Sequence, residues 1–218
     1  MKKFTLSFLV LISTLYVFAL SKDISLSQFM IDSYDIQSGL PQNSVRAIVQ
    51  TRDGFLWLGT EEGFVKFDGI KMKVYDDAFF PISNHKVELI FEEEGNPNLW
   101  VGTDGGGIIK FNYITEEYEI FDVKSGLPEN NISKGVEGQD GTLYFATRRS
   151  GIIVISQNGE KTVLGKSSGL PSNNIGALVK GADGAIWMGS QNFLCRLEGQ
   201  QIIDVEKLPS EITTVDIY

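Results

Sequence analysis

The sequence predicts an all-β protein made of β-propeller blades, because one phrase recurs along it at a regular interval. The phrase DGFLWLGT occupies residues 53–60 and returns in modified form at residues 98–103, 140–147 and 183–190. Its aromatic residues lie at positions 57, 100, 144 and 187, so successive copies are 43, 44 and 43 residues apart. Such a period, filled with short strand-like segments, is typical of propeller blades of about four antiparallel strands each.

A second phrase runs in step with the first. SGLP occurs at residues 38–41, 125–128 and 168–171, and the last two copies are again 43 residues apart. A degenerate copy, FPIS, fills the missing position at residues 80–83, and KLPS at residues 207–210 begins a fifth. Two phrases that share one period indicate an internal repeat instead of chance similarity.

The first full repeat is expected to form a four-stranded meander. Val45, Ala47 and Val49 alternate along its inner strand and are predicted to share one face. Asp53-Gly54 suits a tight hairpin turn, since glycine adopts a positive φ without strain. The four strands are expected at residues 44–50, 55–60, 64–67 and 71–75.

Three motif positions are predicted to hold neighbouring blades together. Large aromatic rings bury the most area, so the aromatic position is expected to lie between blades. The small residue two positions later shares that face and lets the next blade approach closely. The hydroxyl residue after it is expected to hydrogen-bond across strands. In order, these positions hold Trp57, Trp100, Tyr144 and Trp187; Gly59, Gly102, Ala146 and Gly189; and Thr60, Thr103, Thr147 and Ser190.

The extent of the repeats predicts an incomplete, open propeller of about four and a half blades in residues 22–218. Blades are expected at residues 44–76, 86–122, 131–165 and 174–205, with the start of a fifth at residues 211–218. Unpaired strand edges attract partners, so self-association through open blade edges is expected. A closed four-bladed ring is the lesser alternative.

The N-terminus is typical of an export signal. Lys2 and Lys3 precede an apolar run at residues 4–20, and Ala19 and Ser21 place small residues before a cleavage point at Lys22. We therefore expect a signal peptide at residues 1–21 and a periplasmic or secreted location. The alternative is an uncleaved membrane anchor, since about 17 residues is the lower limit for a spanning helix.

The composition excludes several kinds of site. The formal net charge of −9 disfavours nucleic acid as a partner, because an acidic surface repels phosphates. The single cysteine, Cys195, excludes an internal disulfide, and with the single histidine, His85, it leaves too few soft ligands for zinc. No metal and no cofactor are expected.

Residues 38–45, 53–60 and 67–69 together resemble the two-component regulator propeller repeat. This resemblance covers the chain from about Tyr34 onward. It implies the N-terminal part of a periplasmic sensor region of the kind found in bacterial hybrid histidine kinases and some diguanylate cyclases. The sensor regions of that family usually contain whole propellers followed by a membrane helix and a signalling domain, and this chain contains no kinase or cyclase residues. The tryptophan-aspartate repeat is a weaker match, because Leu, Val or Met follows each Trp here.

Candidate ligand-binding residues lie in the loops that vary where the strands repeat. In a propeller, the loops before the inner strand and between the second and third strands share one face, and binding functions concentrate in such loops. The candidates are Asn43, Glu61, Glu62, Asp104, Arg148, Arg149, Gln191 and Asn192. No residue is predicted to be catalytic: residues 102–107 are expected to form a hairpin and not a phosphate loop, and His85 lacks a nucleophile at a recognisable motif.

These observations predict a non-catalytic, exported sensor or interaction module. Its ligand is expected to be a small periplasmic solute or an oligosaccharide, as the resemblance implies. Contact with a membrane is expected only through the signal peptide or a downstream anchor. The alternative is a secreted propeller enzyme, a glycan lyase or hydrolase, for which Glu61, Glu62 and Asp104 are the acid–base candidates.

Overall fold

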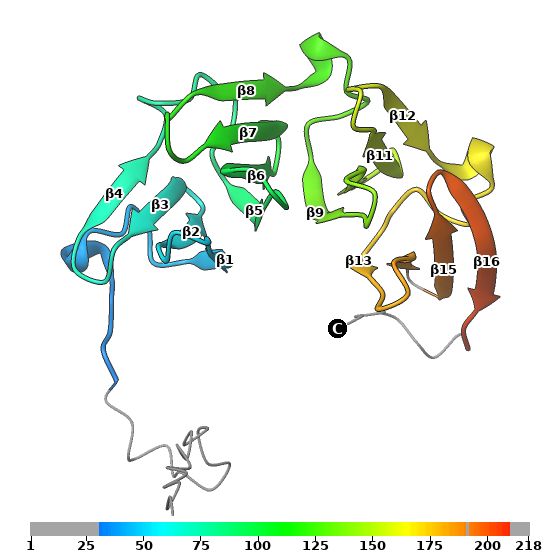
Figure 1. Cartoon of the computed structure of the whole chain (residues 1–218), viewed down its shortest axis with the longest axis horizontal. Coiled ribbons are helices and arrows are strands. Elements are labelled where there is room, and N and C mark those ends of the chain that lie inside the picture. Colours follow the sequence, from blue (N-terminus) through cyan, green and yellow to red (C-terminus); the bar gives the residue numbers. More distant parts are fainter. Residues whose placement is uncertain (1–30, 191, 210–218) are drawn as a thin grey trace, which may run out of the picture. The chain divides into compact units, whose positions relative to one another are not determined.

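The computed structural model describes residues 31–190 and 192–209 (Figure 1). Tyr34–Tyr218 form one compact unit, and of the preceding unit, Met1–Ser33, only residues 31–33 are described. The expected signal peptide at residues 1–21 and the expected strand at residues 211–218 therefore lie outside the described residues. Within the described part, no helix is both long and apolar enough to cross a membrane.

Four antiparallel sheets of four strands each make up the fold, which confirms the all-β prediction. Sheet 1 contains β1 (Val45–Gln50), β2 (Leu56–Thr60), β3 (Gly63–Phe67) and β4 (Met72–Tyr75); sheet 2 contains β5 (Val87–Glu92), β6 (Asn98–Thr103), β7 (Ile108–Asn112) and β8 (Tyr118–Phe121); sheet 3 contains β9 (Ile132–Glu137), β10 (Leu143–Thr147), β11 (Ile152–Ile155) and β12 (Lys161–Leu164); sheet 4 contains β13 (Ala177–Lys180), β14 (Ile186–Ser190), β15 (Phe193–Glu198) and β16 (Gln201–Lys207). In each sheet, strands that are consecutive in the chain are neighbours, so every sheet is a meander.

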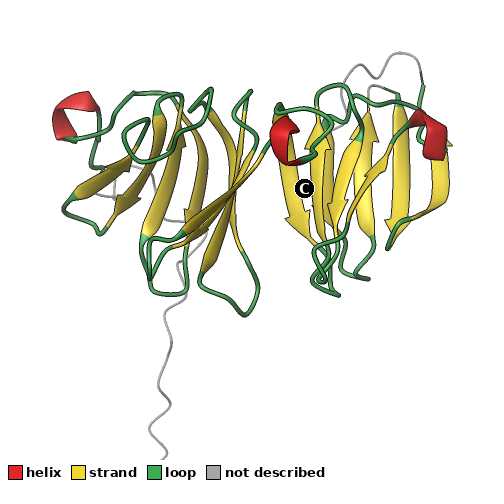
Figure 2. Cartoon of the chain, turned by 90° about the horizontal axis from the view of Figure 1, so that it is seen from above, coloured by secondary structure: helices red, strands yellow, loops and turns green. Residues whose placement is uncertain are grey.

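Three short 3₁₀ helices accompany the SGLP phrases, namely η2 (Ile36–Ser38), η3 (Val123–Ser125) and η4 (Lys166–Ser168) (Figure 2). Each ends at the glycine of its phrase, which takes a left-handed conformation with φ near +100°. Glycine adopts this conformation without strain, and this explains why the phrase contains it.

A β-bulge interrupts the inner strands of sheets 1, 2 and 3. In β1 the bulge lies between Val45 and Ala47, and it changes the expected alternation of the strand. Ala47 and Val49 pack against the core, but Val45 lies beyond the bulge and is 42% exposed, so the prediction that all three share one face is wrong for Val45. A bulge adds one residue to a strand and re-aims the side chains around it.

The hydrophobic core lies between neighbouring sheets, as the motif positions predicted. Trp57 and Tyr144 are fully buried, and Trp100 is 3% exposed. Gly59 and Gly102 leave room for the next sheet: a Cβ on Gly59 would lie 2.5 Å from Cγ1 of Val87. The motif glycine therefore sets the close spacing of sheets 1 and 2.

Trp187 differs from the other motif aromatics, because it is only half-buried. In the described residues no further sheet packs on the side of sheet 4 that this ring faces, and the four sheets do not close into a ring (Figure 1). Sheet 1 shows the same effect: Ile48 is 65% exposed, whereas Ile90, its counterpart in sheet 2, is 8% exposed. Trp187 is therefore less buried than the other motif aromatics, and among the described residues it lies at no contact with a further sheet.

The hydroxyl of the motif closes the turn between the second and third strands. In sheet 1, Thr60 Oγ1 donates to the carbonyl of Gly63 at 2.9 Å and accepts from the N–H of Glu62 at 3.2 Å. Thr103 and Thr147 make the same pair of contacts in their own turns. For these three threonines the hydrogen bonds fix the hairpin turn, whereas the hydroxyl of Ser190 donates across to the carbonyl of Asn174, before β13, at 2.7 Å.

Candidate functional site

Asn43, a candidate ligand residue, has a structural role. Its side-chain oxygen accepts a hydrogen bond from the N–H of Ile36 at 2.9 Å, tying the short helix η2 to the start of β1. Asn130 and Asn173 repeat this contact seven residues after the first residue of their own helices, each at 2.8 Å. The recurrence of Asn at this position is the sequence signal for this role.

An ion-pair network begins at the bulge of β1, where Arg46 is the additional residue. Arg46 contacts Glu61 at 3.2 Å within sheet 1 and Glu88 at 3.2 Å in sheet 2. Glu88 is itself the additional residue of the bulge in β5. The two bulges therefore place opposite charges from neighbouring inner strands against each other.

The network continues from sheet 2 into sheet 3. Lys86 contacts Glu88 at 3.4 Å and Asp104 at 3.2 Å, and Asp104 contacts Arg148 at 3.6 Å. The hydrogen bond to Asp104 holds the pKa of Lys86 above its usual value. The structure thus joins three candidate residues, Glu61, Asp104 and Arg148, into one line of alternating charges.

The second arginine of the candidate set, Arg149, lies in the turn between β10 and β11. The backbone N–H groups of Arg148 and Arg149 and the hydroxyl of Ser150 all donate to the carboxylate of Glu129, at distances of 2.8–3.3 Å. Both arginine side chains are exposed. The carboxylate of Glu129 therefore orders the turn, while the two arginine side chains lie at the surface.

Glu61 and Glu62 line a shallow cavity of about 300 Å³ together with Asp76, Asp77 and His85. The ring nitrogen Nε2 of His85 lies 2.8 Å from the carbonyl oxygen of Phe80, which fixes the ring as part of a loop.

The two remaining candidates, Gln191 and Asn192, follow β14. Gln191 lies outside the described residues. Asn192 is half-buried, and its carbonyl accepts from the N–H of Leu208 at 2.7 Å.

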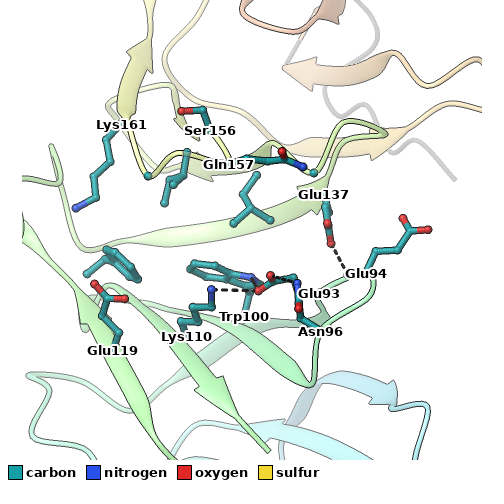
Figure 3. A pocket seen from close by; sticks show the side chains of 15 residues that line it. Glu93, Glu94, Asn96, Trp100, Lys110, Glu119, Glu137, Ser156, Gln157 and Lys161 are labelled. Carbon is teal, nitrogen blue, oxygen red and sulfur yellow. Dashed lines mark hydrogen bonds and ion pairs between the residues drawn. The ribbon is translucent and has the colours of Figure 1, made fainter.

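A cavity of about 540 Å³, which sequence analysis did not identify, lies between sheets 2 and 3 (Figure 3). Trp100 and Phe121 from sheet 2 and Leu143 and Ile155 from sheet 3 form its apolar part. Its volume falls in the range of about 300–1,000 Å³ that is typical of small-molecule sites. Its rim is polar and charged, as Figure 3 shows, with contributions from Glu93, Glu94, Asn96, Lys110, Glu119, Glu137, Ser156, Gln157 and Lys161.

Glu93 is fully partnered at one side of this cavity. Its carboxylate accepts from Nε1 of Trp100 at 3.0 Å and from the side-chain amides of Asn98 at 3.1 Å and Asn96 at 2.7 Å. Lys110 lies 3.4 Å from the same carboxylate and 5.1 Å from the ring centroid of Trp100. These contacts fix the tryptophan and leave Glu93 little capacity for a ligand.

Glu137, at the end of β9, is in a different electrostatic situation. Its carboxylate accepts from the N–H of Glu94 at 2.7 Å, and it forms no ion pair with any described residue. Burial raises the pKa of Glu137, and the negative charges of Glu93 and Glu94 raise it further. A cation placed here would relieve this repulsion.

In residues 31–190 and 192–209, no group of three or more His, Cys, Asp or Glu side chains is arranged to hold an ion.

Comparison with known proteins identifies the repeats. The family model described as "Two component regulator propeller" matches residues 39–62 and 169–192, which contain GLP of the second phrase and the whole first phrase of the first and fourth repeats. These two segments of the chain are similar to the two-component regulator propeller repeat. A curated relative of this propeller chain, histidine kinase P4 from Formosa agariphila, is 45% identical over 49 residues, which is 22% of this chain and 4% of the relative.

Solved structures share the fold. A structure described as the extracellular domain of the hybrid two component system BT3049 from B. thetaiotaomicron matches with a TM-score of 0.73 and 24% identity, covering 82% of this chain and 26% of the other. Virginiamycin B lyase from Staphylococcus aureus matches with a TM-score of 0.60 and 16% identity, covering 75% of this chain and 54% of the other. At these identities the likeness shows the fold alone. The chain spans about a quarter of the BT3049 extracellular domain and 4% of histidine kinase P4.

Proposed function

We propose that this propeller chain is an exported, ligand-binding sensor module, the N-terminal part of a two-component-type signal-transduction protein. The observation that carries the proposal is the match of two of its repeats to the two-component regulator propeller. The likeness to the extracellular domain of a hybrid two component system supports the same role. The apolar run at residues 4–20 supports a location outside the cytoplasm.

The surroundings of the carboxylates in the ion-pair network favour ligand binding over chemical conversion of the ligand. Glycan hydrolysis needs one protonated and one ionised carboxyl group facing the scissile bond. Two of the three acid–base candidates, Glu61 and Asp104, are instead partnered by Arg46, Lys86 and Arg148. These contacts hold the two carboxylates against neighbouring basic side chains, so neither is free to face a scissile bond.

The second candidate function is a secreted propeller enzyme. The observation in its favour is the shared fold with virginiamycin B lyase. Folds host many unrelated functions, so this likeness alone does not carry a lyase activity to the present chain.

A thermal-shift screen of the full chain tests the proposal. Periplasmic solutes and oligosaccharides of different charge are added over a range of concentrations, and the melting midpoint is followed. A ligand that binds only the folded chain raises the midpoint progressively as its concentration exceeds the dissociation constant. A screen in which no solute raises the midpoint would contradict ligand sensing.

A further inference from the structure

The cavity between sheets 2 and 3 has a counterpart between sheets 1 and 2, where side chains occupy the equivalent place. Arg52, two residues beyond the end of β1, reaches Glu92 at the end of β5. Its Nε lies 3.0 Å from the carboxylate, and its N–H also donates to it at 3.2 Å. Tyr113, which follows β7, is buried there and donates its hydroxyl to Glu92. A guanidinium group and an aromatic ring therefore occupy this place.

The gap between sheets 2 and 3 has the same backbone arrangement with different side chains. Glu94 lies two residues beyond the end of β5, and its N–H donates to Glu137 at the end of β9, as the N–H of Arg52 donates to Glu92. The position of Tyr113 is taken by Gln157, which follows β11 in the same register. Arginine has thus been replaced by glutamate and tyrosine by glutamine.

These two replacements create the cavity and its charge. The smaller Gln157 leaves space where Tyr113 fills the first gap, and Glu94 adds a negative charge where Arg52 supplies a positive one. Glu94 contacts one described cation, Lys180 from sheet 4, at 3.8 Å. The side chain of Glu94 is 78% exposed. Lys110 is paired with Glu93, and Lys161 lies 4.8 Å from the ring of Phe121.

We propose that the cavity between sheets 2 and 3 binds a small organic cation, with a guanidinium or ammonium group on Glu137 and an uncharged aliphatic body between Trp100 and Ile155. The ligand takes the place that Arg52 and Tyr113 fill in the first gap. Charge-assisted hydrogen bonds to a carboxylate are about twice as strong as neutral ones, and guanidinium matches a carboxylate with two parallel bonds. This inference deepens the proposed function and rests on it, because it names the class of solute and its site.

Binding of Nα-acetyl-L-arginine amide to the full chain, measured by calorimetry, tests the site, because the guanidinium group is the only charge on this compound. Nα-Acetyl-L-citrulline amide is the matched control, since it has nearly the same shape but no charge. We expect saturable binding of the arginine compound and binding of the citrulline compound that is weaker by about tenfold or more. Equal binding of the two compounds, or no saturable binding of the arginine compound, would overturn the inference.

Variants locate the bound group. Glu137→Gln is expected to weaken binding by about tenfold or more, and Glu94→Arg to abolish it by restoring the arrangement of Arg52 and Glu92. Glu206→Gln, which removes an exposed charge from β16, is the control and is expected to leave binding unchanged. Circular dichroism verifies that each variant is folded, and Glu94→Arg is expected to melt at or above the wild-type temperature.

Unchanged binding in folded Glu137→Gln would overturn the site. Failure of the arginine compound alone, with other solutes stabilising the chain, overturns this inference and leaves the proposed function intact. Failure of every solute overturns the proposed function itself.

Discussion

Each motif tryptophan lies beside a cation from the neighbouring strand. Lys66 lies 5.3 Å from the ring centroid of Trp57, and Arg196 lies 5.9 Å from that of Trp187. Lys110 occupies the same register beside Trp100, and where Tyr144 replaces the tryptophan, Val154 replaces the cation. The cation and the ring attract each other through the electrostatic quadrupole of the indole, so the two positions vary together within the chain.

Replacement of Trp57 by Ala is expected to destabilise the chain more than replacement of Trp187 by Ala. Trp57 is fully buried between sheets, and removing a buried tryptophan costs about 3–5 kcal/mol. Trp187 is half-buried, so less contact is lost there. Urea unfolding followed by circular dichroism measures both free energies. Equal losses would show that the two rings have equivalent surroundings.

Charged residues at the ends of the inner strands give individual sheet contacts opposite pH dependences. Burial raises the pKa of Glu92, but hydrogen bonds from Tyr113 and Arg52 outweigh it, and the pKa lies below the usual value of 4.5. At Glu137 burial is the largest effect and the hydrogen bond from the N–H of Glu94 offsets it only in part, so the pKa lies above that value. The difference follows from the side chains of Tyr113 and Arg52, which donate to Glu92 and are replaced by Gln157 and Glu94 in the next gap.

At the scale of elements, the contact of β5 with the turn after β1 should weaken in acid. A carboxyl group with a lowered pKa in the folded state contributes stability that is present above its unfolded pKa and is lost as the pH falls through the folded value. Glu92→Gln should therefore cost about 1–3 kcal/mol at pH 7 and progressively less below about pH 4.5. Melting curves between pH 3 and 7 measure this. A cost that does not change with pH would show that the pair with Arg52 is not the cause.

The contact of β9 with the turn after β5 should behave in the opposite way. A carboxyl group with a raised pKa in the folded state destabilises the fold at neutral pH, and this penalty disappears as the pH falls through the folded pKa. Glu137→Gln should thus raise the melting midpoint at pH 7 and leave it nearly unchanged near pH 4. A lower midpoint at pH 7 would mean that the carboxylate of Glu137 is well partnered.

The elements could be predicted from sequence to the extent that they repeat. The strands and the role of Gly59 follow from positions that recur every 43 or 44 residues. The bulge at Arg46 could not be foreseen, because alternation in β1 is equally compatible with a regular strand. The cavity was missed because its residues occupy positions that do not recur, and only the structure shows that Gln157 stands where Tyr113 does.

The candidate site was predicted only in part. Variable loops drew attention to Glu61, Asp104 and Arg148, and these charges are joined to one another through Arg46, Glu88 and Lys86. Contacts between residues that are about 40 positions apart depend on how neighbouring sheets are packed, and a single sequence does not reveal this. At these positions the variability of the loops therefore reflects ion pairing, partly between neighbouring sheets.

At the scale of the whole molecule, each sheet is stabilised by its neighbours, and stability in such arrays is a sum of nearest-neighbour contacts. The exposed Ile48 on sheet 1 and the half-buried Trp187 on sheet 4 are apolar surfaces without a neighbouring sheet among the described residues. We predict that the isolated chain self-associates through these faces. Light scattering over a range of concentrations measures the mass, and a stable monomer at every concentration would contradict the prediction.

The fate of a bound solute tests the central claim, that this propeller chain recognises a ligand and does not convert it. A solute that raises the melting midpoint is incubated with the full chain and followed by proton NMR and mass spectrometry. The account predicts that its resonances broaden or shift on binding and that it is recovered chemically unchanged after many hours. Accumulation of a cleaved or eliminated product, abolished by substitution of residues in the chain, would contradict the sensor role and establish an enzyme.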